Sequence, residues 1–369
     1  MPRWTTQDAA FMSEALHLAL QGQGRVEPNP MVGCVLVKGG RIVGRGYHQK
    51  LGGPHAEIEA LRDAGKKAAG STAYVTLEPC NHHGRTPPCT DALIAAKIAR
   101  VVTAIKDPNP QVTGNGLKKL RAAGIHCDIG PLESQARELA APFITFMTSR
   151  RPYVILKWAQ SIDGKIATRT GDSKWITSLA SRRNAHALRA RVDAIIVGVG
   201  TILADDPDLT ARHVRPLRKA ARIIIDPQLR TPLSAKVVRT ARQIPTFVAT
   251  RTKMMSSPKA RRLAAKGCEL LAIPVHGKTL RLRALLTHLH DRAMTNVLVE
   301  GGGRTLGGFV EQKLADEAHI FIAPKLIGGE TAPGPLRNLG PGKMTGLPRV
   351  VPMSLACLDG DLCYTMRFA

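Results

Sequence analysis

Two short segments, Pro54-His55-Ala56-Glu57 and Ala73-Tyr74-Val75-Thr76-Leu77-Glu78-Pro79-Cys80, carry the strongest structural signal in the chain. The first opens a helical pattern over residues 54–64, and the second is an apolar strand, 73–77, that runs into a cysteine. The pattern continues outward on both sides, with expected helices at 6–20, 89–98 and 114–123 and expected strands at 32–37, 41–47, 100–105 and 125–129. Strands that alternate with helices predict an α/β sandwich around a central sheet.

A second α/β run follows a single expected connecting helix at 131–150. Its expected strands are 153–159, 192–198, 221–226, 246–249, 268–272, 296–300 and 317–323, and its expected helices are 178–190, 257–266, 279–290 and 304–314. Residues 347–368 alternate as a strand hairpin, and Thr201–Pro207 is expected to be a polar connection. We therefore predict two different domains, residues 1–147 and 148–369.

The composition is that of a globular chain. Of 369 residues, 44% are hydrophobic and 22% are charged, which excludes a disordered or fibrous protein. The sequence contains neither a membrane-length apolar stretch nor an N-terminal secretory pattern, so no membrane association and a cytoplasmic location are expected. Seven scattered cysteines indicate metal ligands, catalytic thiols or core thiols in a reducing compartment; Cys34, Cys127, Cys268, Cys357 and Cys363 are expected in the core.

The net charge of +25 is unusual, and residues 148–369 contribute +20 of it. One interpretation is a polyanionic partner, either nucleic acid or phosphorylated small molecules. The other is a basic surface with scattered arginines. Because the basic residues occur as dispersed pairs and aromatic residues are only 4%, no nucleic-acid partner is expected.

The combination of His55, Cys80 and Cys89 has the residue types of a catalytic zinc site. Such a site takes three nitrogen and sulfur ligands and leaves a position for water, whose pKa the metal lowers. Glu57, two residues after the histidine, is suited to carry a proton from the water to a leaving amine. This is the pattern of zinc deaminases, although eight residues separate the cysteines instead of two. In an alternative reading Cys80 and Cys89 are unrelated, and His82 or His83 is a ligand or a surface group.

The first half resembles the bifunctional riboflavin-biosynthesis deaminase–reductase family. The resemblance rests on Pro28–Gly33, Gly46-Tyr47-His48, Pro54–Glu57 and Thr76–Cys89, and the long spacing between the cysteines is part of that family's pattern. It implies a cytidine-deaminase-like αβα sandwich that deaminates 2,5-diamino-6-(5-phosphoribosylamino)pyrimidin-4(3H)-one. It also implies that His55, Cys80 and Cys89 bind zinc and that Glu57 is catalytic. Substrate contacts are implied for Asn29, His48, His82 and Arg85.

The second half gives a weaker signal of its own. Glu300–Leu306 follows a strand and opens a helix with three glycines, which suits either phosphate binding or a tight turn. It lacks the dinucleotide fingerprint. Arg189 and Arg212 each carry a guanidinium that can donate two parallel hydrogen bonds to a phosphate. Each is also compatible with a solvent-exposed arginine at the surface.

The resemblance extends to this half through Lys157–Lys165, Trp175–Ser178, Thr201–Pro207 and Glu300–Leu306. It implies a dihydrofolate-reductase-like domain with a mixed sheet, in which NADPH reduces the ribosyl side chain of the deaminated product to ribityl. The implied cofactor contacts are Ala159, Trp175, Thr201, Asp205, Gly302, Gly303, Arg304, Thr305, Leu306, Gly307 and Gly308. The implied substrate contacts are Ser173, Arg189, Leu209, Arg212 and Glu300, with Lys157 and Asp163 as possible polar groups. Pro227 stands where the family often has serine, so a cofactor hydrogen bond there is lost.

Two other functions are compatible with parts of the sequence. One is a nucleic-acid base deaminase with a basic C-terminal binding domain, and the other is a non-enzymatic nucleic-acid-binding protein with a structural zinc. Glu57 argues against the latter, because a structural site is closed by four protein ligands and needs no proton carrier. We expect a phosphorylated small-molecule pyrimidine as substrate and a homo-oligomeric enzyme.

Overall fold

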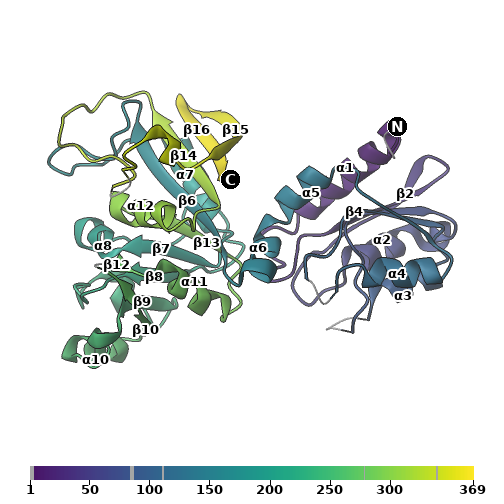
Figure 1. Cartoon of the computed structure of the whole chain (residues 1–369), viewed down its shortest axis with the longest axis horizontal. Helices are drawn as coiled ribbons and strands as arrows, with labels where there is room; N and C mark the ends of the chain where they lie inside the picture. Colours follow the sequence, from purple (N-terminus) through teal and green to yellow (C-terminus); the bar gives the residue numbers. More distant parts are fainter. Residues whose placement is uncertain (1–3, 84–86, 110–111, 278, 338–339) are drawn as a thin grey trace. The chain divides into compact units, whose positions relative to one another are not determined.

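The computed structural model describes residues 4–83, 87–109, 112–277, 279–337 and 340–369. The chain divides into two compact units, residues 1–150 and 151–369 (Figure 1). The boundary expected after residue 147 falls inside α6 (Ala141–Ser149), the last helix of the first unit.

The first unit is a three-layered sandwich built on a five-stranded sheet. The strand order is β2 (Arg41–Tyr47), β1 (Gly33–Lys38), β3 (Thr72–Leu77), β4 (Arg100–Ile105) and β5 (His126–Ile129). β1 is antiparallel to β2 and β3, whereas β3, β4 and β5 run parallel. Helices α1 (Thr6–Leu20) and α5 (Glu133–Leu139) cover one face, and α2 (Ala56–Ala64), α3 (Cys89–Ala95) and α4 (Asn115–Ala122) cover the other (Figure 1). The αβα sandwich is confirmed.

Close backbone packing fixes α2 against the sheet. A Cβ atom added to Gly46 on β2 would lie 2.2 Å from the Ala56 carbonyl oxygen, and one added to Gly44 would lie 2.4 Å from that of Ala60. Only glycine permits this approach of strand and helix. The first turn of α2, which carries His55 and Glu57, is therefore held at one end of the sheet.

The expected single helix at 131–150 is wrong, since the structure has α5 and α6 with a break at Ala140. Pro142 lies in the first turn of α6. Proline has no N–H to donate and clashes with the preceding turn, so it is tolerated where a helix starts but not in its interior.

The second unit contains a nine-stranded mixed sheet. Its order is β10 (Glu269–Ile273), β9 (Thr246–Arg251), β8 (Ala221–Ile225), β7 (Ala194–Gly198), β13 (Asn296–Glu300), β6 (Tyr153–Ser161), β14 (Glu317–Ala323), β16 (Asp361–Phe368) and β15 (Val350–Leu358). The first seven strands are parallel, β16 is antiparallel to β14, and β15 is antiparallel to β16, as the predicted mixed sheet requires. A separate hairpin joins β11 (Val275–His276) to β12 (Thr279–Leu280).

Helices cover both faces of this sheet. They are α7 (Leu179–Arg189), α8 (Val199–Asp205), α9 (Lys236–Arg239), α10 (Pro258–Ala265), α11 (Leu282–His290) and α12 (Gly303–Glu311). The main core lies between the sheet and the α11 and α12 side, where Leu285, Leu289 and Phe309 are fully buried. In the described part of the chain, no helix is long and apolar enough to cross a membrane.

Three details differ from the sequence-based expectations. Residues 199–205 form α8 instead of a polar connection, and α11 begins at Leu282 instead of 279. Cys357 is exposed on the edge strand β15, whereas Cys34, Cys127, Cys268 and Cys363 are buried as expected. The error at Cys357 follows from its place on the edge strand, where apolar sequence does not imply burial.

Candidate active sites

His55, Cys80 and Cys89 converge at one end of the first sheet. His55 is the N-cap of α2, Cys80 lies three residues past β3, and Cys89 opens α3. The His55 Nδ1 atom is 3.2 Å from the Cys89 Sγ and 3.5 Å from the Cys80 Sγ. The three candidate ligand atoms all lie within 4.8 Å of one another. The structure thus brings together the residues that the motif singled out.

These donors fit a zinc ion. Zinc–ligand bonds of about 2.0–2.3 Å in a tetrahedral array separate the ligand atoms by roughly 3.5 Å. The hydrogen bond from Cys89 holds the pKa of the Cys80 thiol well below its usual range, whereas the pKa of Cys89 is raised, so the two sulfurs share one proton. A cation at this point would take the place of that proton and satisfy both thiolates.

Glu57 lies beside the cluster without completing its ligand set. It belongs to the first turn of α2 and is 3% exposed. Burial, followed by the negative charge of Cys80, raises the pKa of Glu57 to about 7, and its carboxylate is within hydrogen-bonding reach of Cys89. A buried carboxyl group whose pKa lies near neutrality is suited to both accept and release a proton.

Asn29 and His48 border the same cluster. The His48 Nδ1 is 2.9 Å from the Pro54 carbonyl oxygen, which can only accept, so Nδ1 carries the proton. The His48 Nε2 is then the acceptor for the Asn29 Nδ2 at 3.2 Å. This leaves the Asn29 carbonyl oxygen available to a ligand. The His48 ring meets the His55 ring edge-on, with 5.3 Å between the centroids.

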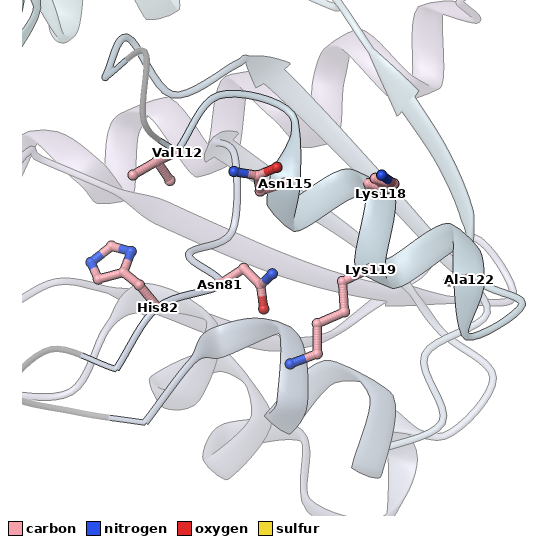
Figure 2. A pocket seen from close by; sticks show the side chains of 7 residues that line it. All are labelled: Asn81, His82, Val112, Asn115, Lys118, Lys119 and Ala122. Carbon is pink, nitrogen blue, oxygen red and sulfur yellow. The ribbon is translucent and has the colours of Figure 1, made fainter.

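The other two expected substrate contacts in this unit lie in the segment between the cysteines. His82 lines a pocket that also includes Asn81 and part of α4 (Figure 2). Arg85 lies outside the described residues.

Sequence reasoning missed Glu78, which is 4% exposed and joins β3 to α4. Its carboxylate accepts hydrogen bonds from the N–H groups of Gly114, Gly116 and Leu117 at 2.9–3.2 Å. A carboxylate at this position satisfies free N–H groups at the start of the helix. Glu78 therefore fixes α4 next to the strand end that carries Cys80.

In the second unit, several expected residues gather at the carboxyl ends of β6, β13 and β7, which are adjacent in the sheet. Glu300 ends β13 and pairs in register with Lys157 of β6. Ala159 follows on β6, and Thr201 lies in α8 directly after β7. Ligands of open α/β sheets bind in the crevice at such strand ends.

Arg189 and Glu300 form a two-pronged ion pair at this edge. The Arg189 Nε and Nη2 donate to the two Glu300 oxygens, each at 2.7 Å, and Nη1 donates to the Thr210 carbonyl at 3.2 Å. Although burial opposes ionisation, Arg189 lowers the pKa of Glu300 to about 2. Burial lowers the pKa of Lys157, whose ammonium lies over the Phe321 ring. The fork of Arg189 is thus directed at Glu300.

Arg212 lies close to this ion pair but remains accessible. Its side chain is 50% exposed and contacts Asp208 at 3.2 Å. Its backbone N–H donates to the His186 Nδ1 at 3.1 Å. Burial, with the charges of Arg189 and Arg212, lowers the pKa of His186 to about 4. Leu209, in contrast, is only 2% exposed.

In the glycine-rich turn at the start of α12, two glycines permit close packing and a third lies in open space. A Cβ on Gly303 or Gly307 would lie 2.7 Å or 2.0 Å from the backbone of residues 334–337, so these two glycines permit that segment to pack on α12. Gly302, the N-cap of α12, has open space around it. The turn after β7 is close by, because a Cβ on Gly198 would lie 2.4 Å from the Thr305 Oγ1.

The remaining residues of the turn divide by exposure. Leu306 is fully buried in the core, Arg304 is exposed, and Thr305 and Gly308 are half-buried. The first turns of α8 and α12 both lack a side-chain cap, so their N–H groups are available to an anion such as a dinucleotide diphosphate. This arrangement fits NADPH.

Other expected reductase residues lie in loops beyond the strand ends. Trp175 is 65% exposed, with the Arg182 guanidinium 4.6 Å from its ring centroid, and Ser173 is half-buried nearby. Asp163 accepts from the N–H groups of Ile327 and Gly328 at 3.1 and 2.7 Å, so its carboxylate ties two loops together.

Asp205 and Pro227 are the last two residues with a sequence-based expectation about the cofactor. Asp205 is exposed at the end of α8, and Pro227 is half-buried directly after Asp226. The fully buried Asp226 accepts two hydrogen bonds from Thr231, both at 2.7 Å.

Comparison with known proteins accounts for both units. Residues 5–105 match the cytidine and deoxycytidylate deaminase zinc-binding region, and residues 152–361 match the RibD C-terminal domain. The chain is 50% identical to the riboflavin biosynthesis protein RibD of Aquifex aeolicus over 87% of this chain and 88% of that protein. It is 42% identical to RibD of Escherichia coli, with 97% and 98% coverage.

Solved structures agree with these sequence matches. The fold is similar to that of Acinetobacter baumannii RibD, with a TM-score of 0.86, 38% identity and coverage of 98% and 99%. It is also similar to a diaminohydroxyphosphoribosylaminopyrimidine deaminase/5-amino-6-(5-phosphoribosylamino)uracil reductase of Thermotoga maritima, with a TM-score of 0.84, 36% identity and the same coverage. A zinc-deaminase domain is therefore joined to a reductase domain. The chain belongs to the RibD family of riboflavin biosynthesis proteins.

Proposed function

We propose that this chain catalyses two steps of riboflavin biosynthesis with two separate sites. The first unit deaminates 2,5-diamino-6-(5-phosphoribosylamino)pyrimidin-4(3H)-one to 5-amino-6-(5-phosphoribosylamino)uracil. The second reduces the ribosyl side chain of that product to ribityl with NADPH. The observation that carries the proposal is the convergence of one histidine, two cysteines and a buried glutamate in a chain whose relatives are RibD proteins.

In the deaminase we assign His55, Cys80 and Cys89 as zinc ligands. Zinc bound there would act as a Lewis acid that makes water nucleophilic near neutral pH. Glu57 then takes a proton from the attacking water and passes it to the departing amine, so that ammonia leaves as a neutral molecule. Asn29 is suited to bind the pyrimidine through its carbonyl oxygen, and His48, which accepts the Asn29 amide hydrogen bond and meets the His55 ring edge-on, is suited to hold Asn29 in place.

In the reductase we assign the cofactor to the turns that open α8 and α12. Their uncapped N–H groups and the open space at Gly302 support binding of the diphosphate of NADPH, which supplies the hydride. Thr201 and Thr305 border these turns. Ala159 lies at the end of β6, where the nicotinamide would lie across the strand ends.

The substrate of the reductase would contact the neighbouring polar side chains. Lys157 and Glu300 face each other across adjacent strands, and Arg189 holds the Glu300 carboxylate in place. Arg212 is accessible and therefore suited to bind the substrate phosphate.

The test is a coupled assay on purified protein. NADPH oxidation should require the diaminopyrimidine substrate and should follow release of ammonia. NADPH oxidation without that substrate would contradict the proposal. Ammonia release from an oligonucleotide, at a rate that falls steeply with salt, would instead support a nucleic-acid base deaminase.

We further propose a cytoplasmic homo-oligomer. The edge strand β15 exposes Val351 and Leu355 by 52% and 63%. Proteins normally cover or blunt an apolar edge strand, and a second copy of this chain would do so. Sedimentation of the wild type and of Leu355→Lys tests this, because the variant should dissociate.

A further inference from the structure

Arg212, the residue proposed to bind the phosphate of the reductase substrate, lies in an irregular segment of the second unit. Residues 207–213 belong to the connection between α8 and β8. Leu209 and His213 have φ values of 53° and 61°, a left-handed conformation that is unfavourable for residues other than glycine. Within the part of the chain that the structure describes, the main chain of 207–213 forms no hydrogen bond with another main-chain group. Side chains from elsewhere must therefore hold this segment in its conformation.

Two side chains of α7 contact the main chain of the segment directly. The Arg189 Nη1 donates to the Thr210 carbonyl at 3.2 Å. The His186 Nδ1 accepts a hydrogen bond from the Arg212 N–H at 3.1 Å. Because His186 and Arg189 are three residues apart, they lie on the same side of α7. His186 is the one of the two that bonds to residue 212 itself.

The His186 ring is a fixed hydrogen-bond acceptor. It is 8% exposed, and the His213 ring lies edge-on to it with 5.8 Å between the centroids. Since the Arg212 N–H can only donate, the His186 Nδ1 carries no proton and the ring is neutral. The ring therefore fixes the main chain at Arg212 without adding a positive charge next to it.

The Arg212 side chain, in contrast, is free to meet a ligand. It is 50% exposed, and its contact with Asp208, which is 48% exposed, is a surface ion pair of the kind that contributes little to stability. A phosphate can compete for this guanidinium. The Arg189 guanidinium is committed to Glu300, so Arg212 is the more available arginine of the pair.

We propose that His186 is a positioning residue of the reductase, which fixes the main chain at Arg212 so that the Arg212 guanidinium can bind the substrate phosphate. The inference rests on the phosphate contact proposed for Arg212. Without the acceptor, the irregular segment must be ordered each time substrate binds, and that ordering weakens binding. The effect of losing His186 should therefore appear in substrate binding and not in the chemical step.

The test measures NADPH oxidation by the full chain with 5-amino-6-(5-phosphoribosylamino)uracil supplied. His186→Leu removes the acceptor and should raise the KM for this compound roughly 2–10-fold, as loss of one hydrogen bond does, with little change in kcat or in the KM for NADPH. His186→Asn should restore a KM near that of the wild type, because its Oδ1, attached to Cγ like the histidine Nδ1, can accept the same hydrogen bond. His288→Leu, on α11 of the same unit, is the matched control.

Arg212→Ala shows whether His186 acts through Arg212. In this background His186→Leu should cause no further rise in KM, because the side chain that His186 positions is absent. Equal rises in KM in both backgrounds would overturn the proposal, since His186 would then act independently of Arg212. A loss confined to kcat would also overturn it, because that result indicates a smaller folded fraction of the variant.

The same measurements separate this inference from the proposed function on which it rests. If Arg212→Ala raises the KM and His186→Leu does not, the positioning role of His186 alone is wrong. An unchanged KM in Arg212→Ala would overturn the phosphate contact of Arg212 and the role of His186 with it. Failure of the wild type to reduce the supplied compound would overturn the proposed reductase function.

Discussion

The two candidate sites are assembled in different ways. In the first unit, three ligand atoms within 4.8 Å and a buried glutamate come from the starts of two helices and the end of one strand. In the second, the polar groups are spread over the ends of β6, β7 and β13 and over loops, and the strongest contact is between Arg189 and Glu300. A metal site demands particular donor atoms at short distances, whereas a nucleotide site uses backbone N–H groups and space. We therefore expect single side chains to matter more in the deaminase than in the reductase.

The largest effect is expected for Cys89→Ala. Removal of one of three ligands should eliminate tightly bound zinc and reduce deamination by more than about 10³-fold, because the metal activates the water. Metal analysis and an ammonia-release assay measure both quantities. The control is Cys357→Ala, which removes an exposed thiol from the other unit. Full zinc occupancy in Cys89→Ala would contradict the ligand assignment.

Glu57→Gln should separate metal binding from proton transfer. We expect zinc to be retained and the deamination rate to fall by about 10²–10⁴-fold, the usual contribution of a positioned general acid–base. Glu59→Gln changes a half-buried neighbour on the same helix, which pairs with Arg62, and should remain active. A near-normal rate in Glu57→Gln would exclude the proton-carrier role.

Arg212→Ala should have a smaller effect, confined to the reductase. Loss of a charge-assisted phosphate contact costs about 1.5–3 kcal/mol, or roughly 10–150-fold in kcat/KM, mainly through KM. Because Arg212 is half-exposed, we expect the lower part of this range. Arg215→Ala is the matched control. If Arg212→Ala reduces normally but binds oligonucleotide less well, the basic surface serves nucleic acid instead.

The smallest effect concerns pH and His186. Burial and two neighbouring arginines lower the pKa of His186 to about 4, so below about pH 6.5 the unfolded chain binds a proton that the folded chain resists. The contribution of neutral His186 to the free energy of unfolding is fully present above pH 6.5 and is lost as the pH falls toward 4. After allowance for solvent screening we expect about 1–2 kcal/mol. The free energy of unfolding, measured with denaturant, should differ less between pH 7 and pH 5 in His186→Gln than in the wild type or in His17→Gln. Equal differences in all three proteins would contradict this role of His186.

Much of the first unit could be predicted because its signals are local. Helix 54–64 and strand 73–77 follow from apolar periodicity, and the observed α2 and β3 agree within two residues. The zinc motif could be identified because few residue types bind the metal. Glu78 was missed because its partners, Gly114 to Leu117, are far away in the sequence.

The second unit was harder to predict for the same reason. A sequence cannot show that Arg189 pairs with Glu300, so the Arg189 guanidinium was predicted to be available to a phosphate. Gly303 and Gly307 resembled phosphate-binding glycines, yet each permits close packing of residues 334–337, a segment that follows later in the chain. Long-range contacts of this kind have no local signature.

The central claim is that one chain carries two independent sites. Its most direct test is NADPH oxidation by purified Glu57→Gln when 5-amino-6-(5-phosphoribosylamino)uracil is supplied. Because Glu57 is buried in the first unit and the reductase residues all belong to the second, the variant should reduce the supplied compound at the wild-type rate while deamination is lost. Loss of reduction together with deamination would contradict two independent sites and would indicate a shared site or an intermediate that must be passed between them.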